Sequence, residues 1–307
     1  MGTSVPILFF NLFIYMKIAV CVHLYHIDMW DKIKKYLDNL NRDYLLFVNL
    51  PVKDERNIPY DFDWEFYVSY YQDLKNANKN TYEKAINHYL KHGEKEGRFY
   101  SKGNLEIISK LKKYKSDVNI LLSPNKGVDI GGFLYTYKKV PKDIDLILKI
   151  HTKAGLGSNE KPSTHLKKHG LENSIKRGEV WFRNLLSGVL GDKERVNRII
   201  ESFIDNPKCG MVGFKKYNSF QLNKKEMNRV FDLLLLDVDY TNHFFIGGTI
   251  FWVDNSILKK YLTNSVIDEI LNKSSFGYTY EPSINHAMER VFGCLVYNEN
   301  KEIYVIK

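Results

Sequence analysis

Short apolar runs alternate with amphipathic stretches along most of the chain. Four early runs are continuously apolar and rich in β-branched residues, which is typical of buried strands in a parallel sheet. They span residues 17–26, 44–52, 118–124 and 145–152. Between them, apolar residues recur at helical spacing over residues 29–40, 104–115 and 129–140. This alternation predicts an α/β fold, a parallel sheet with helices on both of its faces.

Polar residues mark where several of these elements begin or end. Asp28 and Asp129 are expected to cap the first and third helices, and Pro51 is expected to end the second strand. In the second half, helices are predicted over residues 178–190, 192–207, 224–240, 255–271 and 284–297. Asp192 and Asn255 are the expected caps of two of them. Strands are predicted over residues 211–214 and 244–254, with an edge strand over 302–307.

Residues 60–101 interrupt the rhythm between the second strand and its following helix. Two amphipathic stretches, residues 64–75 and 81–93, predict a helical hairpin packed on its own aromatic side chains. His88 and His92 lie one turn apart, a spacing that can hold a metal. The zinc-protease pattern H-E-x-x-H is lacking there, so packing is the preferred interpretation.

Composition narrows the class of partner. The chain of 307 residues carries a net charge of +9, which favours anionic partners. The basic residues are dispersed instead of clustered, which argues against nucleic-acid binding. Three cysteines without a C-x-x-C pair favour neither a disulfide framework nor a thiolate zinc site, and a reducing, cytoplasmic setting is expected.

The first sixteen residues form an apolar N-terminal extension. Residues 5–16 are too few to span a bilayer, which takes about 20 apolar residues. They also lack the basic start and cleavage site of a signal peptide. Two interpretations remain, an upstream extension before a start at Met16 and a peripheral membrane-associating segment.

A histidine and two lysines crowd the end of the fourth predicted strand. Lys149, His151 and Lys153 alternate in the sequence KIHTK. Parallel sheets bind ligands at the carboxyl ends of their strands, so positive groups there indicate an anionic ligand such as a nucleotide diphosphate. The alternative is that the lysines are surface charges at the ends of a core strand.

Two glycine-containing segments could let a ligand approach the backbone. Gly127 precedes the third helix, whose amino end could bind phosphate, although no phosphate-loop fingerprint is present. Gly247 and Gly248 interrupt an aromatic strand, where Trp252 could wall a sugar site. The simpler interpretations are an ordinary turn and a β-bulge with core aromatics.

A third group of chemical interest lies on the last predicted helix. His286, Glu289 and Arg290 fall within about one turn, shortly after Glu281. Together they could deprotonate a hydroxyl and hold a phosphate, or they could form a surface salt bridge. The sequence also contains Asp237-Val-Asp239, but it does not follow the fourth strand, where sugar transferases place their metal-binding D-x-D.

Five motifs occur in an order that resembles the rhamnan synthesis protein F family. They are VCVHLYH, NKGVDIGGFL, LKIHTK, GGTIFWV and HAMERVFG. Members of that family are glycosyltransferases, or candidates, of bacterial and viral polysaccharide assembly. The insertion is itself similar to a helical module of sugar transferases. The matching residues are Tyr70, Asp73, Leu74, His88, Tyr89, Gly93, Glu96, Gly97 and Arg98.

The resemblance implies a GT-A-like, Rossmann-type domain over residues 17–307, with the helical insertion within it. It implies a catalytic cleft containing Glu289, His286 and Glu281. It places substrate contacts at His23, Asn125, Gly127, Asp129, Lys149, His151, Lys153, Gly247, Gly248, Thr249, Trp252 and Arg290. Val128 stands where the family usually has arginine, which weakens a phosphate contact at that position.

The implied activity is transfer of a sugar, such as rhamnose or another deoxyhexose, from a nucleotide-diphosphate donor to a glycan acceptor. Metal dependence stays open: protein cations could neutralise the diphosphate, or Mg²⁺ or Mn²⁺ could do so, with Asp129 and Asp145 as candidate ligands. The alternative function is a non-catalytic glycan-binding or assembly protein that retains the fold.

Overall fold

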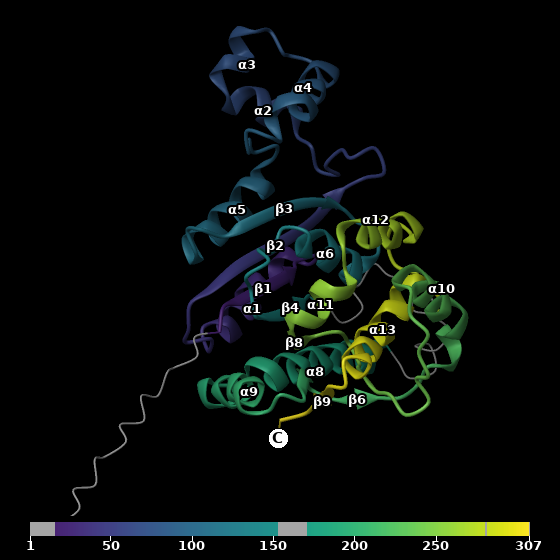
Figure 1. The fold of residues 1–307 in the computed structure, drawn as a ribbon. Coiled ribbons are helices and arrows are strands. Elements are labelled where there is room, and N and C mark those ends of the chain that lie inside the picture. The colour runs from purple at the N-terminus through teal and green to yellow at the C-terminus, as the bar shows by residue number, and fades with distance from the viewer. Residues whose placement is uncertain (1–15, 153–170, 280, 307) are drawn as a thin grey trace, which may run out of the picture.

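The computed structural model describes residues 16–152, 171–279 and 281–306, and its centre is a seven-stranded sheet (Figure 1). The strand order is β3-β2-β1-β4-β8-β5-β9. The strands are β1 Ile18–His23, β2 Tyr44–Lys53, β3 Asn119–Pro124, β4 Leu146–His151, β5 Cys209–Gly213, β8 Phe251–Asp254 and β9 Glu302–Tyr304. A separate antiparallel pair consists of β6 Lys216–Tyr217 and β7 Phe245–Ile246.

The sheet is mostly parallel, as the alternating pattern predicts. Strands β3, β2, β1 and β4 pair in parallel, and β5 pairs in parallel with β9. Strand β8 lies between β4 and β5 and runs antiparallel to both. The predicted edge strand near the carboxyl end is confirmed as β9. The chain is therefore a mixed α/β protein.

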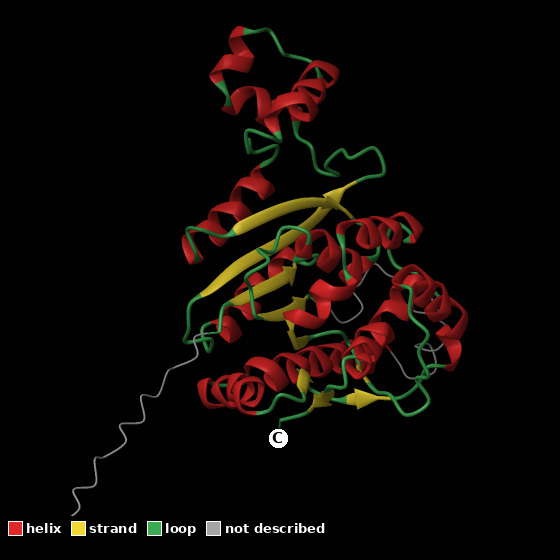
Figure 2. Ribbon diagram, in the orientation of Figure 1, coloured by secondary structure: helices red, strands yellow, loops and turns green. Residues whose placement is uncertain are grey.

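Helices cover both faces of this sheet (Figure 2). One core cluster joins the sheet to α6 Val128–Tyr137, α10 Lys224–Leu234, α11 Asn255–Tyr261, α12 Asn264–Lys273 and α13 Ile284–Asn298. The other joins it to α1 Trp30–Leu37, α5 Lys102–Tyr114, α8 Leu171–Leu190 and α9 Lys193–Asp205. Alternate residues of β1, such as Val20 and Cys21, contribute to opposite clusters, as period-two side-chain geometry requires.

The segment between β2 and α5 forms a helical module that stands away from the sheet (Figure 1). It contains α2 Trp64–Tyr70, α3 Gln72–Asn76, α4 Tyr82–His88 and a π-helical turn, η2 Tyr89–Gly93. The first expected helix is broken because Tyr71 is extended. Tyr67, Tyr89 and Tyr100 pack in a core of the module's own. The buried Lys53 of β2 forms an ion pair with Glu94, which ties the module to the sheet.

Some predicted boundaries are wrong. Asp28 does not cap α1, because it lies in a short 3₁₀ turn, η1 Ile27–Met29, and the N-cap is Met29. Pro51 does not end β2, which continues to Lys53. The proline lies where the register with β3 is irregular, and strands tolerate proline at such irregularities. The Asp192 cap is confirmed, since its carboxylate accepts a hydrogen bond from the Arg195 amide.

Three long predicted elements are shorter or divided in the structure. The helix over residues 224–240 stops at Leu234 because Leu235 adopts a left-handed conformation, with φ of 54°. The strand over residues 244–254 becomes β7 and β8, separated by the glycine pair. The helix over residues 255–271 becomes α11 and α12, and Asp254 caps α11 in place of Asn255.

The described ranges contain no helix with both the length and the apolar character needed to cross a bilayer. The apolar residues 1–15 lie outside those ranges, as does Lys153.

Candidate functional site

The candidate site lies where β1 and β4 end side by side. The chain passes from β1 to β2 and β3, and then returns to place β4 on the other side of β1. His23 at the end of β1 is the register partner of His151 at the end of β4. This reversal of strand order is a topological switch point, where open α/β sheets form ligand crevices.

A buried ion pair stands directly behind these strand ends. The Lys149 side chain is 1% exposed, and its Nζ lies 2.7 Å from Asp129 Oδ2. The same ammonium donates to the Thr249 carbonyl at 2.9 Å and to the Thr249 hydroxyl oxygen at 3.0 Å. The Thr249 hydroxyl in turn donates to Asp129. Three residues far apart in sequence are thereby fixed to one another.

This arrangement corrects the predicted role of Asp129 as a helix cap. Helix α6 begins after Gly127, and no side chain caps it. Burial by itself would raise the pKa of Asp129, but the charges of Lys149 and His151 hold that pKa well below its usual value. Asp129 therefore stays ionised. The ammonium of Lys149 neutralises Asp129, so any influence of this lysine on an anionic ligand passes through a network.

His151 adds a second basic side chain to the network. Its Nε2 lies 2.7 Å from the Gly248 carbonyl oxygen, and its Nδ1 lies 3.1 Å from that of Thr152. Carbonyl oxygens only accept hydrogen bonds, so the imidazolium form makes both bonds at once. Nε2 also lies 3.8 Å from Asp129 Oδ2, which favours that charged form.

His23 is held in its neutral form. Its Nδ1 lies 2.8 Å from Asn49 Oδ1, and the Asn49 amide donates to Ser123. Burial lowers the pKa of His23 to about 4, so this imidazole is neutral near pH 7. Gly132 of α6 explains part of that burial, because a Cβ atom there would overlap His23 Nδ1. The second glycine of the I-G-G sequence thus lets α6 cover the histidine.

The Gly247-Gly248-Thr249 turn closes the site from the β8 side. Gly248 and Thr249 have φ of 79° and 50°, in the left-handed region. The Gly248 amide donates to Glu289 Oε1 at 2.7 Å, while its carbonyl accepts from His151. Glu289 on α13 therefore connects the last helix to the strand ends. We call His23, Asp129, Lys149, His151, Thr249 and Glu289 the switch-point cluster.

Arg290, the next residue of α13, reaches into a different environment. It is 5% exposed, and its guanidinium contacts Glu281 Oε1 at 3.1 Å and the Ser219 carbonyl at 2.9 Å. It also donates to the His286 carbonyl at 2.8 Å. It also lies 3.5 Å from Glu289 Oε2, so the structure brings Glu281, His286, Glu289 and Arg290 together around one guanidinium.

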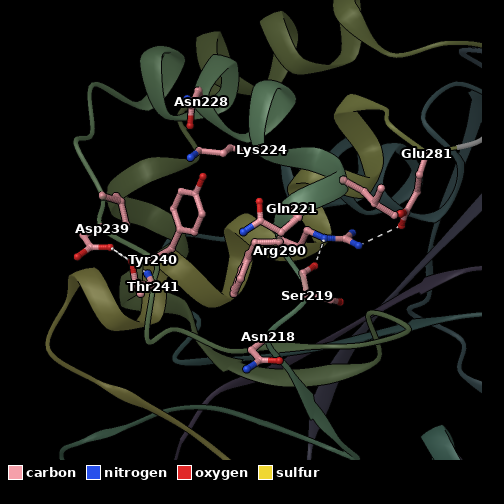
Figure 3. Close-up of a pocket in the computed structure, with 13 residues that line it drawn as sticks. Asn218, Ser219, Gln221, Lys224, Asn228, Asp239, Tyr240, Thr241, Glu281 and Arg290 are labelled. Carbon is pink, nitrogen blue, oxygen red and sulfur yellow. Dashed lines mark hydrogen bonds and ion pairs between the residues drawn. The ribbon is translucent and has the colours of Figure 1, made fainter.

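A cavity of about 760 Å³ lies on the Arg290 side (Figure 3). Its walls come from residues 218–222, from the first turns of α10, from residues 238–241 and from Glu281 and Arg290. Sequence reasoning missed it. Asp239, of the Asp237-Val-Asp239 sequence that does not follow the fourth strand, lines the wall. Its carboxylate accepts hydrogen bonds from the amide and hydroxyl of Thr241.

The remaining predicted residues are spread more widely. Asn125 and Gly127 bond through their backbones to residues 275–277. Trp252 is fully buried in the sheet core, and its indole donates to the Val189 carbonyl. Asp145 precedes β4, at the amino end of the strand, whereas His151 lies at its carboxyl end. The Asp145 carboxylate accepts a hydrogen bond from the Lys17 amide. It is thus separated from Asp129 by the length of a strand.

The described residues do not offer a ready metal site. They contain no group of three histidine, cysteine, aspartate or glutamate side chains that could hold an ion. Of the two candidate ligands, Asp129 is already bonded to Lys149 and Thr249, and Asp145 lies at the far edge. Within this part of the chain, the two candidates do not fit as a pair.

Fold and site define a mixed α/β protein with a charged crevice at a topological switch point. The family model of rhamnan synthesis protein F matches residues 98–301, about two thirds of the chain. The chain belongs to this family, which implies a part in the synthesis of rhamnan or a related polysaccharide. The match covers α6, β4, β8 and α13, and it begins after β1, β2 and most of the helical module. The comparisons with curated proteins and with solved structures gave no match.

Proposed function

We propose that the protein is a glycosyltransferase with a GT-A-like arrangement. It transfers a deoxyhexose such as rhamnose from a nucleotide-diphosphate sugar to a hydroxyl of a glycan acceptor. The observation that carries this proposal is the pairing of His23 with His151 across the switch point, with the Asp129–Lys149 pair behind them. Membership of a polysaccharide-synthesis family supplies the substrate class.

The reaction needs a base for the acceptor and positive charge for the leaving group. Glu289 is the proposed base, because its carboxylate lies beside the Gly248 turn at the edge of the crevice. Glu281 is the second candidate. In the transfer, the acceptor oxygen forms a bond to the anomeric carbon while the bond to the diphosphate breaks. The base takes the hydroxyl proton, and the electron pair leaves on the diphosphate.

Charge on the departing diphosphate grows during this step, so cations fixed near it lower the barrier. His151 in its imidazolium form and Lys153, two residues later in the sequence, are the proposed cations. Lys149 contributes by holding Asp129 and Thr249 in place, since its bonds are directed into the protein.

The decisive experiment is a binding and transfer assay with a panel of nucleotide sugars. Thermal unfolding should shift upward with the cognate donor, because a ligand that binds only the folded state stabilises it. Repeating the assay with EDTA and with added Mn²⁺ tests the metal. If no member of the panel stabilises the protein in either condition, the enzyme proposal fails and the glycan-binding alternative is favoured.

The role of Glu289 is tested separately with Glu289→Gln. The expected result is a loss of turnover of about 100-fold or more, which is the scale of general base catalysis, with donor binding retained. Glu281→Gln asks whether the second candidate is the base instead. Glu106→Gln, on the exposed face of α5, is the matched control. Unchanged turnover in Glu289→Gln would remove this residue from the mechanism.

A further inference from the structure

The cavity beside Arg290 has the chemistry of a sugar-binding site. We propose that it binds a neutral saccharide and, resting on the proposed transferase function, that this saccharide is the acceptor. Its volume of about 760 Å³ lies within the range of small-molecule sites. It borders the switch-point cluster, which supplies the proposed donor contacts, because Arg290 lies 3.5 Å from Glu289 Oε2.

The walls offer both kinds of contact that a sugar ring needs. Amide groups of Gln221 and Asn228 line the cavity and can each donate and accept hydrogen bonds, as sugar hydroxyls require. Phe220 and Tyr240 also line it, with ring centroids 5.3 Å apart, and give an aromatic surface for the apolar face of a sugar. Figure 3 shows Gln221 between Lys224 and the Arg290 side chain, with Tyr240 on the side of Gln221 away from Arg290.

The charges lining the cavity balance one another. Arg290 is paired with Glu281 at 3.1 Å, and Lys224 shares the cavity with Asp239. Hydrogen bonds from Thr241 lower the pKa of Asp239, which keeps it ionised. Two cations and two carboxylates give no net charge, so the cavity favours a neutral ligand over a phosphate or a nucleotide.

Tyr240 carries a hydroxyl that the described part of the chain leaves without a hydrogen-bond partner, although the atom is buried. Figure 3 shows the hydroxyl end of this side chain directed toward Lys224. Buried polar groups are nearly always satisfied, so the hydroxyl calls for a partner from outside the protein. A sugar hydroxyl meets this need because it can donate and accept.

The cavity is placed to deliver a hydroxyl toward the proposed base. Glu289 and Arg290 are consecutive on α13, and the first contacts the Gly248 turn while the second borders the cavity. The Arg290 guanidinium also lies 5.0 Å from the Phe245 ring centroid, two residues before that turn begins. The cavity and the switch-point cluster thus meet at two consecutive residues of α13, whose side chains lie 3.5 Å apart.

The test measures saccharide binding by calorimetry without any nucleotide. The probes are disaccharides of rhamnose, glucose, galactose and N-acetylglucosamine, each at millimolar concentration. At least one should bind, and Tyr240→Phe should weaken it about tenfold by removing one hydrogen bond to the ligand. The same variant should unfold at an unchanged or higher temperature, because it removes an unsatisfied hydroxyl. A purely structural tyrosine would show the opposite pattern.

Tyr60→Phe is the matched control, since Tyr60 is 62% exposed and lies outside the cavity. The inference is overturned if no disaccharide binds, or if Tyr240→Phe binds the disaccharide as well as the wild type does. It is also overturned if pyrophosphate displaces the sugar from the wild type but not from Lys224→Met, because the cavity would then be an anion site. Nucleotide sugars are titrated in parallel. Saccharide binding without nucleotide-sugar binding would contradict the transferase proposal, and with it the acceptor role, but not the saccharide site. Nucleotide-sugar binding without saccharide binding would contradict the saccharide site and leave the transferase proposal standing.

Discussion

Two cations, one in the sheet and one in the helical module, show how burial changes the meaning of an ion pair. Lys149 is 1% exposed and bonds to Asp129 and Thr249. Arg98 makes an equally complete set of contacts, with both oxygens of Asp73, with Glu96 and with the Tyr71 ring. However, the Asp73 side chain is 56% exposed. The bond lengths are similar, and the surroundings are not.

The difference is one of dielectric environment. Water and salt screen the Arg98 pair, and exposed pairs typically contribute less than about 1 kcal/mol. Lys149 has lost its water and Asp129 keeps little, with 21% of its side chain exposed, so each charge depends strongly on the other. Such a pair adds little net stability, but it fixes Thr249 and the strand ends in one geometry. The pair in the sheet can therefore organise a site, while the pair in the module holds two surface segments together.

The largest expected effect comes from breaking the buried pair. Lys149→Met should lower the free energy of unfolding by about 3 kcal/mol, because Asp129, whose side chain is only 21% exposed, would lose its partner. Urea denaturation at pH 7 measures this change. Lys149→Met combined with Asp129→Asn should recover much of the loss, since no buried charge is left unpaired. A loss below about 1 kcal/mol in the single variant would show that water reaches Asp129.

The second expected effect depends on pH and again contrasts the two regions. Burial lowers the pKa of His23 to about 4, from a value near 6.5 in the unfolded chain. Between these values the unfolded state binds a proton that the folded state does not, so stability falls as the pH falls from 6.5 to 4. The contribution of His23 to this fall is about 3 kcal/mol.

His88 of the module provides the comparison. Burial also lowers its pKa, but this side chain is only partly buried. His23→Gln should flatten the stability profile between pH 6.5 and 4, and His88→Gln should change it much less. Asp129 acts in a separate window, because its depressed pKa makes stability fall only at lower pH. Equal slopes for the wild type and His23→Gln would show that His23 titrates normally.

Hydrophobic patterning could predict the parallel half of the sheet because burial on both faces leaves a mark in the local sequence. The runs that became β1, β2 and β4 are mostly apolar and mostly buried, whereas the edge strand β3 is only partly buried. Hydrophobic patterning could not predict that β8 runs antiparallel to its neighbours. Strand direction depends on the path of the preceding turn. The Gly247-Gly248 sequence is equally consistent with a turn between two strands and with a β-bulge inside one strand.

The site was predictable only in part, for a related reason. The basic strand end suggested Lys149 and His151, but their partners lie about 100 residues away along the chain. A local pattern made Asp129 look like a helix cap, whereas its strongest neighbour is Lys149 on β4. The Arg290 cavity is harder to detect in the sequence than the basic strand end. Its polar and aromatic residues come from three separated segments, and only the fold brings them together.

The smallest expected effect completes the comparison, because the same chemical change can be made in both pairs. Asp73→Asn in the module should cost less than about 1 kcal/mol, and the cost should shrink further in 1 M salt, where screening acts within about 3 Å. Asp129→Asn keeps the size of the side chain but strands the Lys149 ammonium, so its cost should be several times larger and insensitive to salt. Urea denaturation at low and high salt measures both. If the two variants lost similar stability with similar salt dependence, burial would not be what distinguishes the two pairs, and the switch-point cluster would have to be held by its hydrogen bonds alone.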